Sequence, residues 1–69
     1  MVEIFKTNVH EEDHASSLLD AISISFPAIK VNFDLEDCDR ILKVEGEHFK
    51  PEHIVQLLHD NGYHCEVLA

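Results

Sequence analysis

The stretch Ile29-Lys30-Val31-Asn32-Phe33-Asp34-Leu35-Glu36 alternates apolar and polar side chains at every step. Side chains of a strand point to opposite faces in turn, so this pattern predicts a strand with one buried and one solvated face. Polar residues 36–39 follow as a turn, and residues 40–46 return as a second strand with Leu42 and Val44 pointing inward. The chain therefore contains an antiparallel hairpin with one face for a core.

A further strand is predicted before this hairpin, over residues 2–8. Val2 and Ile4 are expected on one face of it and Phe5 on the other. We expect Phe5, together with Ile41 of the hairpin, to lie on a sheet face that is open to solvent. Two apolar side chains on adjacent strands of an open face indicate a surface for a dimer or a partner protein.

Between these strands the apolar spacing changes from two residues to the helical period. A helix is predicted over residues 11–25, since Pro27 pushes the residue before it out of helical conformation. The acidic residues at its start suit the positive end of the helix dipole. Its apolar stripe consists of Ala15, Leu18, Leu19, Ile22 and Phe26.

The C-terminal third repeats this order of helix and strand. Pro51 fits the first turn of a second helix, and the pair Asn61-Gly62 is typical of a helix end. Tyr63, Cys65 and Val67 then alternate as a closing strand. The buried stripe of the second helix is predicted to consist of Ile54, Leu57 and Leu58.

The predicted order is thus strand, helix, strand, strand, helix, strand, and the two helix-containing halves resemble each other. Two right-handed units of this kind interleave in one antiparallel sheet, with both helices on one face. The fold class is α+β, a ferredoxin-like sandwich, formed by residues 1–69 as a single domain. The strands are expected in the spatial order fourth, first, third, second.

Composition narrows the possible partners. The chain has 69 residues, 14 of them acidic and 5 basic, for a formal net charge of -9. A surface this negative repels phosphate backbones and anionic lipids, so neither nucleic acid nor membrane is an expected partner. So short a chain offers no enclosed substrate cavity, and we expect no enzyme. The sequence also lacks a signal-peptide pattern, which favours a cytoplasmic location.

The two cysteines do not form a disulfide framework of the kind found in secreted proteins, which agrees with a reducing cytoplasm. Cys38 lies in the acidic turn and is expected to be exposed. Cys65 alternates with apolar neighbours and is expected to be a small core residue.

The predicted topology brings three loops to one edge of the sheet, at residues 8–11, 36–39 and 61–63. More than half of the acidic residues would gather at this edge, where a functional site is most expected. These residues are Glu11, Glu12, Asp13, Asp34, Glu36, Asp37, Asp39 and Asp60.

The string His10-Glu11-Glu12-Asp13-His14 matches the H-E-x-x-H pattern of zinc metalloproteases. In those enzymes both histidines lie on one face of a buried helix, and the glutamate activates a metal-bound water. Here the string lies at a junction between a strand and a helix, among acidic residues. A hydrolytic site is therefore not expected, whereas non-catalytic metal binding stays open.

The whole layout resembles the heavy-metal-associated domain, the family of small copper chaperones and of metal-binding modules in metal-transporting ATPases. That family has G-M-x-C-x-x-C after its first strand and a Gly-aromatic pair before its last, which Gly62-Tyr63 matches. Aligning the first helix puts Val9 at the methionine, Glu11 at the first cysteine and His14 at the second. The resemblance implies a metal-binding loop between the first strand and the first helix.

The missing thiolates change which metal that loop could bind, because Cu(I) requires soft sulfur ligands. His10, Glu11 and His14 instead offer nitrogen and oxygen donors suited to a divalent transition metal, namely Zn, Ni, Cu or Co. His64 and Asp60 could approach from the neighbouring loop.

Loss of the metal site is the alternative. The chain would then be a protein-interaction or regulatory domain, similar to the ACT type, that acts by forming a homodimer or binding a partner protein.

Overall fold

The computed structural model describes residues 1–36 and 38–68, and it confirms the predicted α+β ferredoxin-like fold. Four antiparallel strands form one sheet in the order β2-β3-β1-β4. The predicted boundaries agree with the structure to within two residues. The elements are β1 (Val2–Thr7), α1 (Glu12–Ser25), β2 (Lys30–Asp34), β3 (Ile41–Glu45), α2 (Pro51–Asp60) and β4 (Cys65–Val67).

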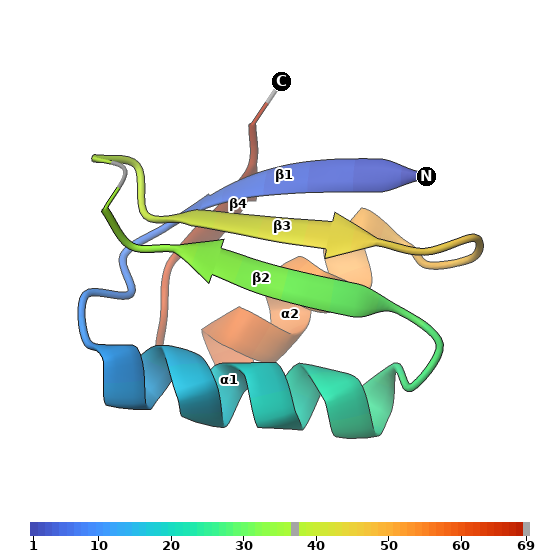
Figure 1. Ribbon diagram of the computed structural model, residues 1–69, viewed down its shortest axis with the longest axis horizontal. Coiled ribbons are helices and arrows are strands. Elements are labelled where there is room, and N and C mark those ends of the chain that lie inside the picture. The colour runs from blue at the N-terminus through green and yellow to red at the C-terminus, as the bar shows by residue number, and fades with distance from the viewer. Residues whose placement is uncertain (37, 69) are drawn as a thin grey trace.

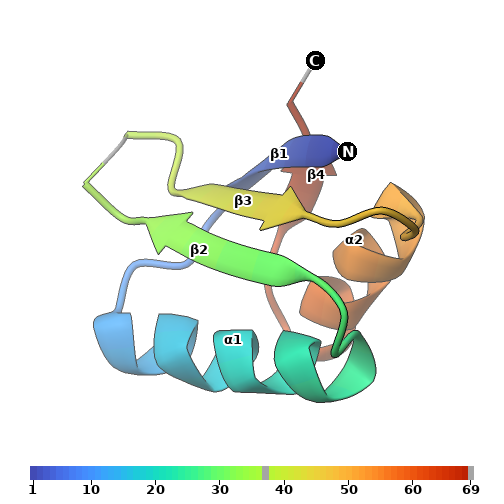
Figure 2. The same cartoon turned by 45° about the vertical axis from the view of Figure 1, so that its right-hand side comes forward.

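The molecule has two layers, a twisted sheet and a pair of helices on one of its faces (Figure 1). Helix α1 packs against β2, and α2 packs against β4. The view in Figure 2 shows that no element of the described chain covers the other face of the sheet. No helix in that part of the chain is long and apolar enough to cross a bilayer.

The core lies between the sheet and the helices and is built from the predicted apolar stripes. Burial of these side chains is the main source of stability in so small a protein. Leu57, predicted to be buried, is half-buried at the margin of the core. The buried core residues are Phe5, Val9, Ala15, Leu18, Ile22, Leu42, Val44, Ile54, Leu58 and Cys65.

The predicted orientation of the first strand is wrong. Phe5 is fully buried and faces the helices, whereas Val2 is 53% exposed and Ile4 is half-buried on the opposite face. The cross-strand register gives the reason. Phe5 pairs with Leu42, and residues directly opposite each other in a sheet share a face, so the inward Leu42 requires an inward Phe5.

We call the uncovered side of the sheet the open face. Ile41 lies on it as predicted, and Ile4 takes the place expected for Phe5. Alternation along the strands assigns a fixed set of side chains to this surface. They are Val2, Ile4, Lys6, Lys30, Asn32, Asp34, Ile41, Lys43, Glu45, Glu66 and Leu68.

Both helices end where the sequence predicts. Helix α1 stops at Ser25, and Pro27 follows two residues later. Helix α2 starts with Pro51 and is followed by Gly62, whose φ of 88° lies in the left-handed region that glycine adopts without strain. This glycine turns the chain back toward the sheet, and so it places the loop that precedes β4.

Gly46 is required for close packing at the end of β3. A Cβ at this position would lie 2.5 Å from Cγ2 of Ile29. We expect Gly46→Ala to lower the free energy of unfolding by about 1–3 kcal/mol, as overpacking does, in a urea titration. Ile29→Ala removes the clashing methyl group and serves as the control background. If Gly46→Ala lowers the free energy of unfolding as much in the Ile29→Ala background as in the parent chain, the steric explanation is wrong.

Candidate functional site

Hydrogen bonds join the three loops at the predicted edge of the sheet. The Asn8 N–H donates to the His64 carbonyl oxygen at 3.4 Å, and the His64 N–H donates to Asn8 Oδ1 at 2.8 Å. The Thr7 N–H donates to the Asp39 carbonyl oxygen at 3.2 Å. We call this region the loop edge; it comprises residues 8–14, 36, 38–40 and 61–64. The β1–α1 loop therefore contacts the loop before β4, and Thr7 at the end of β1 contacts the β2–β3 turn.

Buried groups below the loop edge hold the β1–α1 loop in place. The Thr7 hydroxyl donates to the Arg40 carbonyl oxygen at 2.6 Å and accepts the Val9 N–H at 3.3 Å. Val9 itself is fully buried. Arg40 has a φ of 49° and donates from its guanidinium to the Leu35 carbonyl oxygen, which closes the turn between β2 and β3. The base of the loop is thus fixed, while its tip is exposed.

The three predicted metal ligands lie at this exposed tip. Glu11 is the N-cap of α1 with an extended backbone, and its side chain makes no capping hydrogen bond. His10 precedes the helix, whereas His14 lies in its first turn. All three side chains are exposed. Because His10 is outside the helix, the H-E-x-x-H string lacks the single helix face that a metalloprotease uses.

Two further histidines, His59 and His64, lie next to each other at the end of α2 and in the loop before β4. The His64 ring is 6.3 Å from the His59 ring between centroids, and its Nε2 is 3.8 Å from a carboxylate oxygen of Glu66. The His14 ring lies 6.0 Å from the Tyr63 ring at an angle of 55°. The remaining two histidines, His48 and His53, line a pocket at the other end of the molecule.

The histidine and carboxylate side chains lie at the loop edge, but they are not arranged as a complete set of metal ligands. Across residues 1–36 and 38–68, no group of three or more His, Cys, Asp or Glu side chains lies in a position to hold a metal ion. The donors at the edge are exposed, so rotation of side chains alone can change the distances between them.

The predicted gathering of acidic residues follows the topology. Glu12 and Asp13 lie in the first turn of α1, where they suit the helix dipole. Asp60 ends α2 and accepts a hydrogen bond from the Gln56 side chain at 2.8 Å. Asp37 lies outside the described residues. Two basic groups also reach this region: Lys6 Nζ lies 3.7 Å from Asp39 Oδ1, and Arg40 closes the neighbouring turn.

The two cysteines differ as the sequence predicted. Cys38 is exposed, and Cys65 is 2% exposed within the core. Burial raises the pKa of the Cys65 thiol to about 12, and the nearby Glu66 carboxylate adds to this effect. Cys65 is therefore a neutral packing residue rather than a nucleophile or a ligand.

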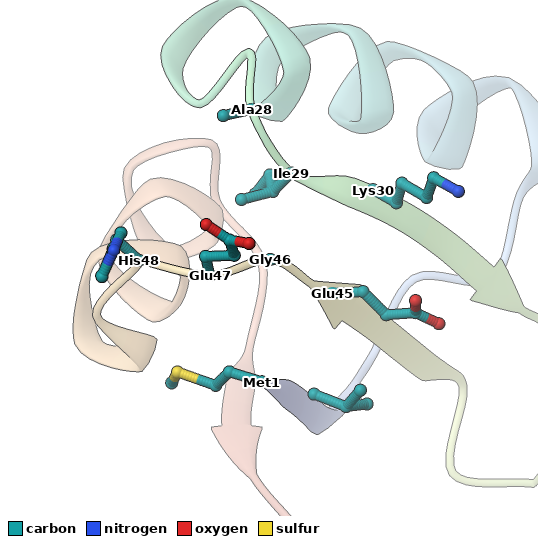
Figure 3. A pocket seen from close by; sticks show the side chains of 9 residues that line it. Met1, Ala28, Ile29, Lys30, Glu45, Gly46, Glu47 and His48 are labelled. Carbon is teal, nitrogen blue, oxygen red and sulfur yellow. The ribbon is translucent and has the colours of Figure 1, made fainter.

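Three pockets of the described chain have no lining side chain from His10, Glu11 or His14. One pocket of about 480 Å³ is at the opposite end of the molecule, between the N-terminus, the start of β2 and the end of β3. Figure 3 shows that His48, Glu47 and Met1 line one side of it, and Ala28, Ile29 and Lys30 another. A second pocket of about 440 Å³ lies between α1 and β2.

Sequence reasoning missed Asn8 as an organising residue of the loop edge. Its side chain accepts the hydrogen bond from His64, a residue 56 positions away. No local pattern marks an asparagine that pairs with so distant a backbone group. The structural role of Arg40 was missed as well, since a left-handed arginine in a turn has no sequence signature.

The comparisons with known proteins return nothing that places this chain in a family: no protein-family model matches it, and no curated protein does.

Proposed function

We propose that this chain is a non-enzymatic domain, similar to the heavy-metal-associated domain, that binds one divalent transition metal ion at its loop edge. His10, Glu11 and His14 supply the ligands, and the ion is Zn, Ni, Cu or Co. The observation that carries the proposal is the pair of hydrogen bonds between Asn8 and His64. They hold a second histidine-bearing loop beside the first.

The chemistry of the donors agrees with this choice of metal. Imidazole nitrogen and carboxylate oxygen suit borderline divalent ions, and this edge has a single cysteine, the turn residue Cys38. The surrounding carboxylates attract cations and can accept the second N–H of a ligating imidazole, which orients the ring.

The affinity should be moderate because the ligands are not preorganised. Each exposed side chain that becomes ordered on binding costs about 0.5–1.5 kcal/mol. We therefore expect micromolar rather than nanomolar binding. Protons compete for the imidazoles, so the binding weakens as the pH falls.

Tyr63 provides a direct test because it is the chain's one tyrosine and there is no tryptophan. Its ring lies beside His14, so Cu(II) or Ni(II) bound there should quench the tyrosine fluorescence in a saturable way at one equivalent. An amide-resolved NMR titration with Zn(II) should show shifts confined to residues 8–15 and 59–65. His10→Ala/His14→Ala should abolish both signals.

The matched control is His48→Ala/His53→Ala, which removes the same number of histidines from the opposite end of the molecule. This variant should bind the metal as the parent chain does. Equal loss in both variants, or shifts centred on His48 and His53, would contradict the proposed site. The alternative function, protein interaction, rests on a different surface, the open face of the sheet.

A further inference from the structure

The open face differs in charge from the rest of the molecule. Three of the chain's five basic residues, Lys6, Lys30 and Lys43, lie on it, together with the three carboxylates Asp34, Glu45 and Glu66. Their formal charges cancel. The remaining residues of the sequence, 11 acidic and 2 basic, therefore carry the entire net charge of -9.

Apolar side chains gather on the β1–β4 side of the open face. The Leu68 N–H donates to the Ile4 carbonyl oxygen at 2.8 Å, so these two side chains lie side by side on adjacent strand segments. Val2 and Ile41 lie next to them on the same face, and Val2 and Leu68 are 53% and 41% exposed. Both helices are on the other side of the sheet, so no element of the described chain covers these side chains (Figure 2).

We propose that the open face binds the open face of a second copy of this chain. The argument is electrostatic. Two copies that each carry a charge of -9 repel one another through their helices and loops. Among the described surfaces, the open face has positive and negative charges that balance, so two copies that approach through it meet less of this repulsion at the contact.

The order of charges along β2 fits a two-fold symmetric contact. Lys30 and Asp34 lie at opposite ends of β2, and Asn32 lies between them opposite Lys43, which in turn pairs with Ile4. Consider a two-fold axis that lies between the two sheets and runs perpendicular to the strands, level with Lys43 and Ile4. Rotation about this axis places each end of a strand opposite the other end of the same strand in the second copy. Lys30 then faces Asp34 of the second copy, and Asp34 faces its Lys30.

The same axis places two of these apolar side chains against their own counterparts. Ile4 and Leu68 meet their own counterparts in the second copy, which shields them from water. Lys43 also meets its counterpart, but its charge is compensated by Glu45 at 3.1 Å in the same chain. The contact thus pairs opposite charges at Lys30 and Asp34 and apolar groups at Ile4 and Leu68, whereas Ile41 faces Glu45 and Val2 faces Lys6 of the second copy.

The size of the surface predicts a weak dimer. Four strands spaced about 4.8 Å apart and about 3.3 Å per residue along a strand give a face of about 19 by 17 Å. Stable interfaces bury about 800 Å² on each partner, and this face lies below that value. The dimer should therefore form in the upper micromolar range and separate on dilution.

Analytical ultracentrifugation from low micromolar to millimolar concentration tests the proposal, with a reversible shift from monomer to dimer expected. Lys30→Glu places a glutamate against Asp34 of the second copy and should weaken the dimer by about tenfold or more. Asp34→Lys should weaken it similarly. Lys30→Glu/Asp34→Lys exchanges the two charges and should restore the parent affinity.

Lys50→Glu is the control, because it makes the same change in net charge at a residue outside the open face. It should weaken the dimer less than Lys30→Glu does. A chain that stays monomeric throughout the range overturns the proposal. So does a dimer that Lys30→Glu and Lys50→Glu weaken equally, or one that the charge exchange fails to restore. Circular dichroism of each variant verifies that the fold is retained.

Discussion

Phe5→Ala should lower the free energy of unfolding by about 3–5 kcal/mol, the usual cost of truncating a buried phenylalanine. Phe5 is fully buried beneath both helices and pairs with Leu42 and Val67 in the centre of the sheet. A protein of 69 residues has a total stability of about 3.5–10 kcal/mol. The substitution therefore removes a large part of the stability, and a urea titration followed by circular dichroism measures the loss.

Ile4→Ala is the matched control, since Ile4 adjoins Phe5 in sequence but lies half-buried on the open face. Ile4→Ala should lower the free energy of unfolding by no more than about 1.5 kcal/mol, because only part of the Ile4 side chain becomes buried on folding. Dilute protein keeps any dimer out of this measurement. If Ile4→Ala proves the more costly substitution, the orientation of β1 described above is wrong.

Alkaline pH should destabilise the fold through Cys65. The pKa of its thiol is about 12 in the folded chain, against an ordinary value of 9.0. Above pH 9 the unfolded chain loses this proton while the folded chain keeps it, so stability falls as the pH rises from 9 toward 12. The free energy of unfolding falls by about 1.4 kcal/mol per pH unit in this range, and the total loss approaches 4 kcal/mol.

Comparison with Cys65→Ala isolates this contribution, because all the other ionisable groups are common to the two chains. The parent chain should lose stability more steeply than Cys65→Ala above pH 9, and the two slopes should agree below pH 8. Cys38→Ser in both backgrounds removes the exposed thiol from the measurement. Parallel curves from pH 8 to 11 would show that the Cys65 thiol ionises as easily in the fold as outside it.

The sequence was sufficient for the fold because local signals agreed with one another. Strict alternation over residues 29–36, the proline at each helix boundary and Gly62 each marked an element that the structure contains. The error concerned β1, where apolar residues occupy both faces. Alternation alone could not orient that strand, and the register against Leu42, which did, depends on contacts between residues distant in sequence.

Less of the candidate site than of the fold could be predicted from the sequence. The topology correctly placed three loops together, since strand order determines which loops share an edge. Short sequence motifs indicated His10, Glu11 and His14 as candidate ligands, but such motifs do not give the distances between exposed side chains. The contact from Asn8 to His64, which organises the edge, spans most of the chain and leaves no local trace.

The strand order also bears on how the chain folds. The β2–β3 hairpin joins neighbours in sequence, whereas the pairing of β1 with β4 must close a loop of 56 residues between Asn8 and His64. Loop-closure entropy makes the hairpin the early event and the β1–β4 pairing a late one. The hydrogen bond from the His64 N–H to the Asn8 side chain, which links the first strand to the last, therefore forms after the folding barrier. Asn8→Ala should speed unfolding and leave the folding rate nearly unchanged.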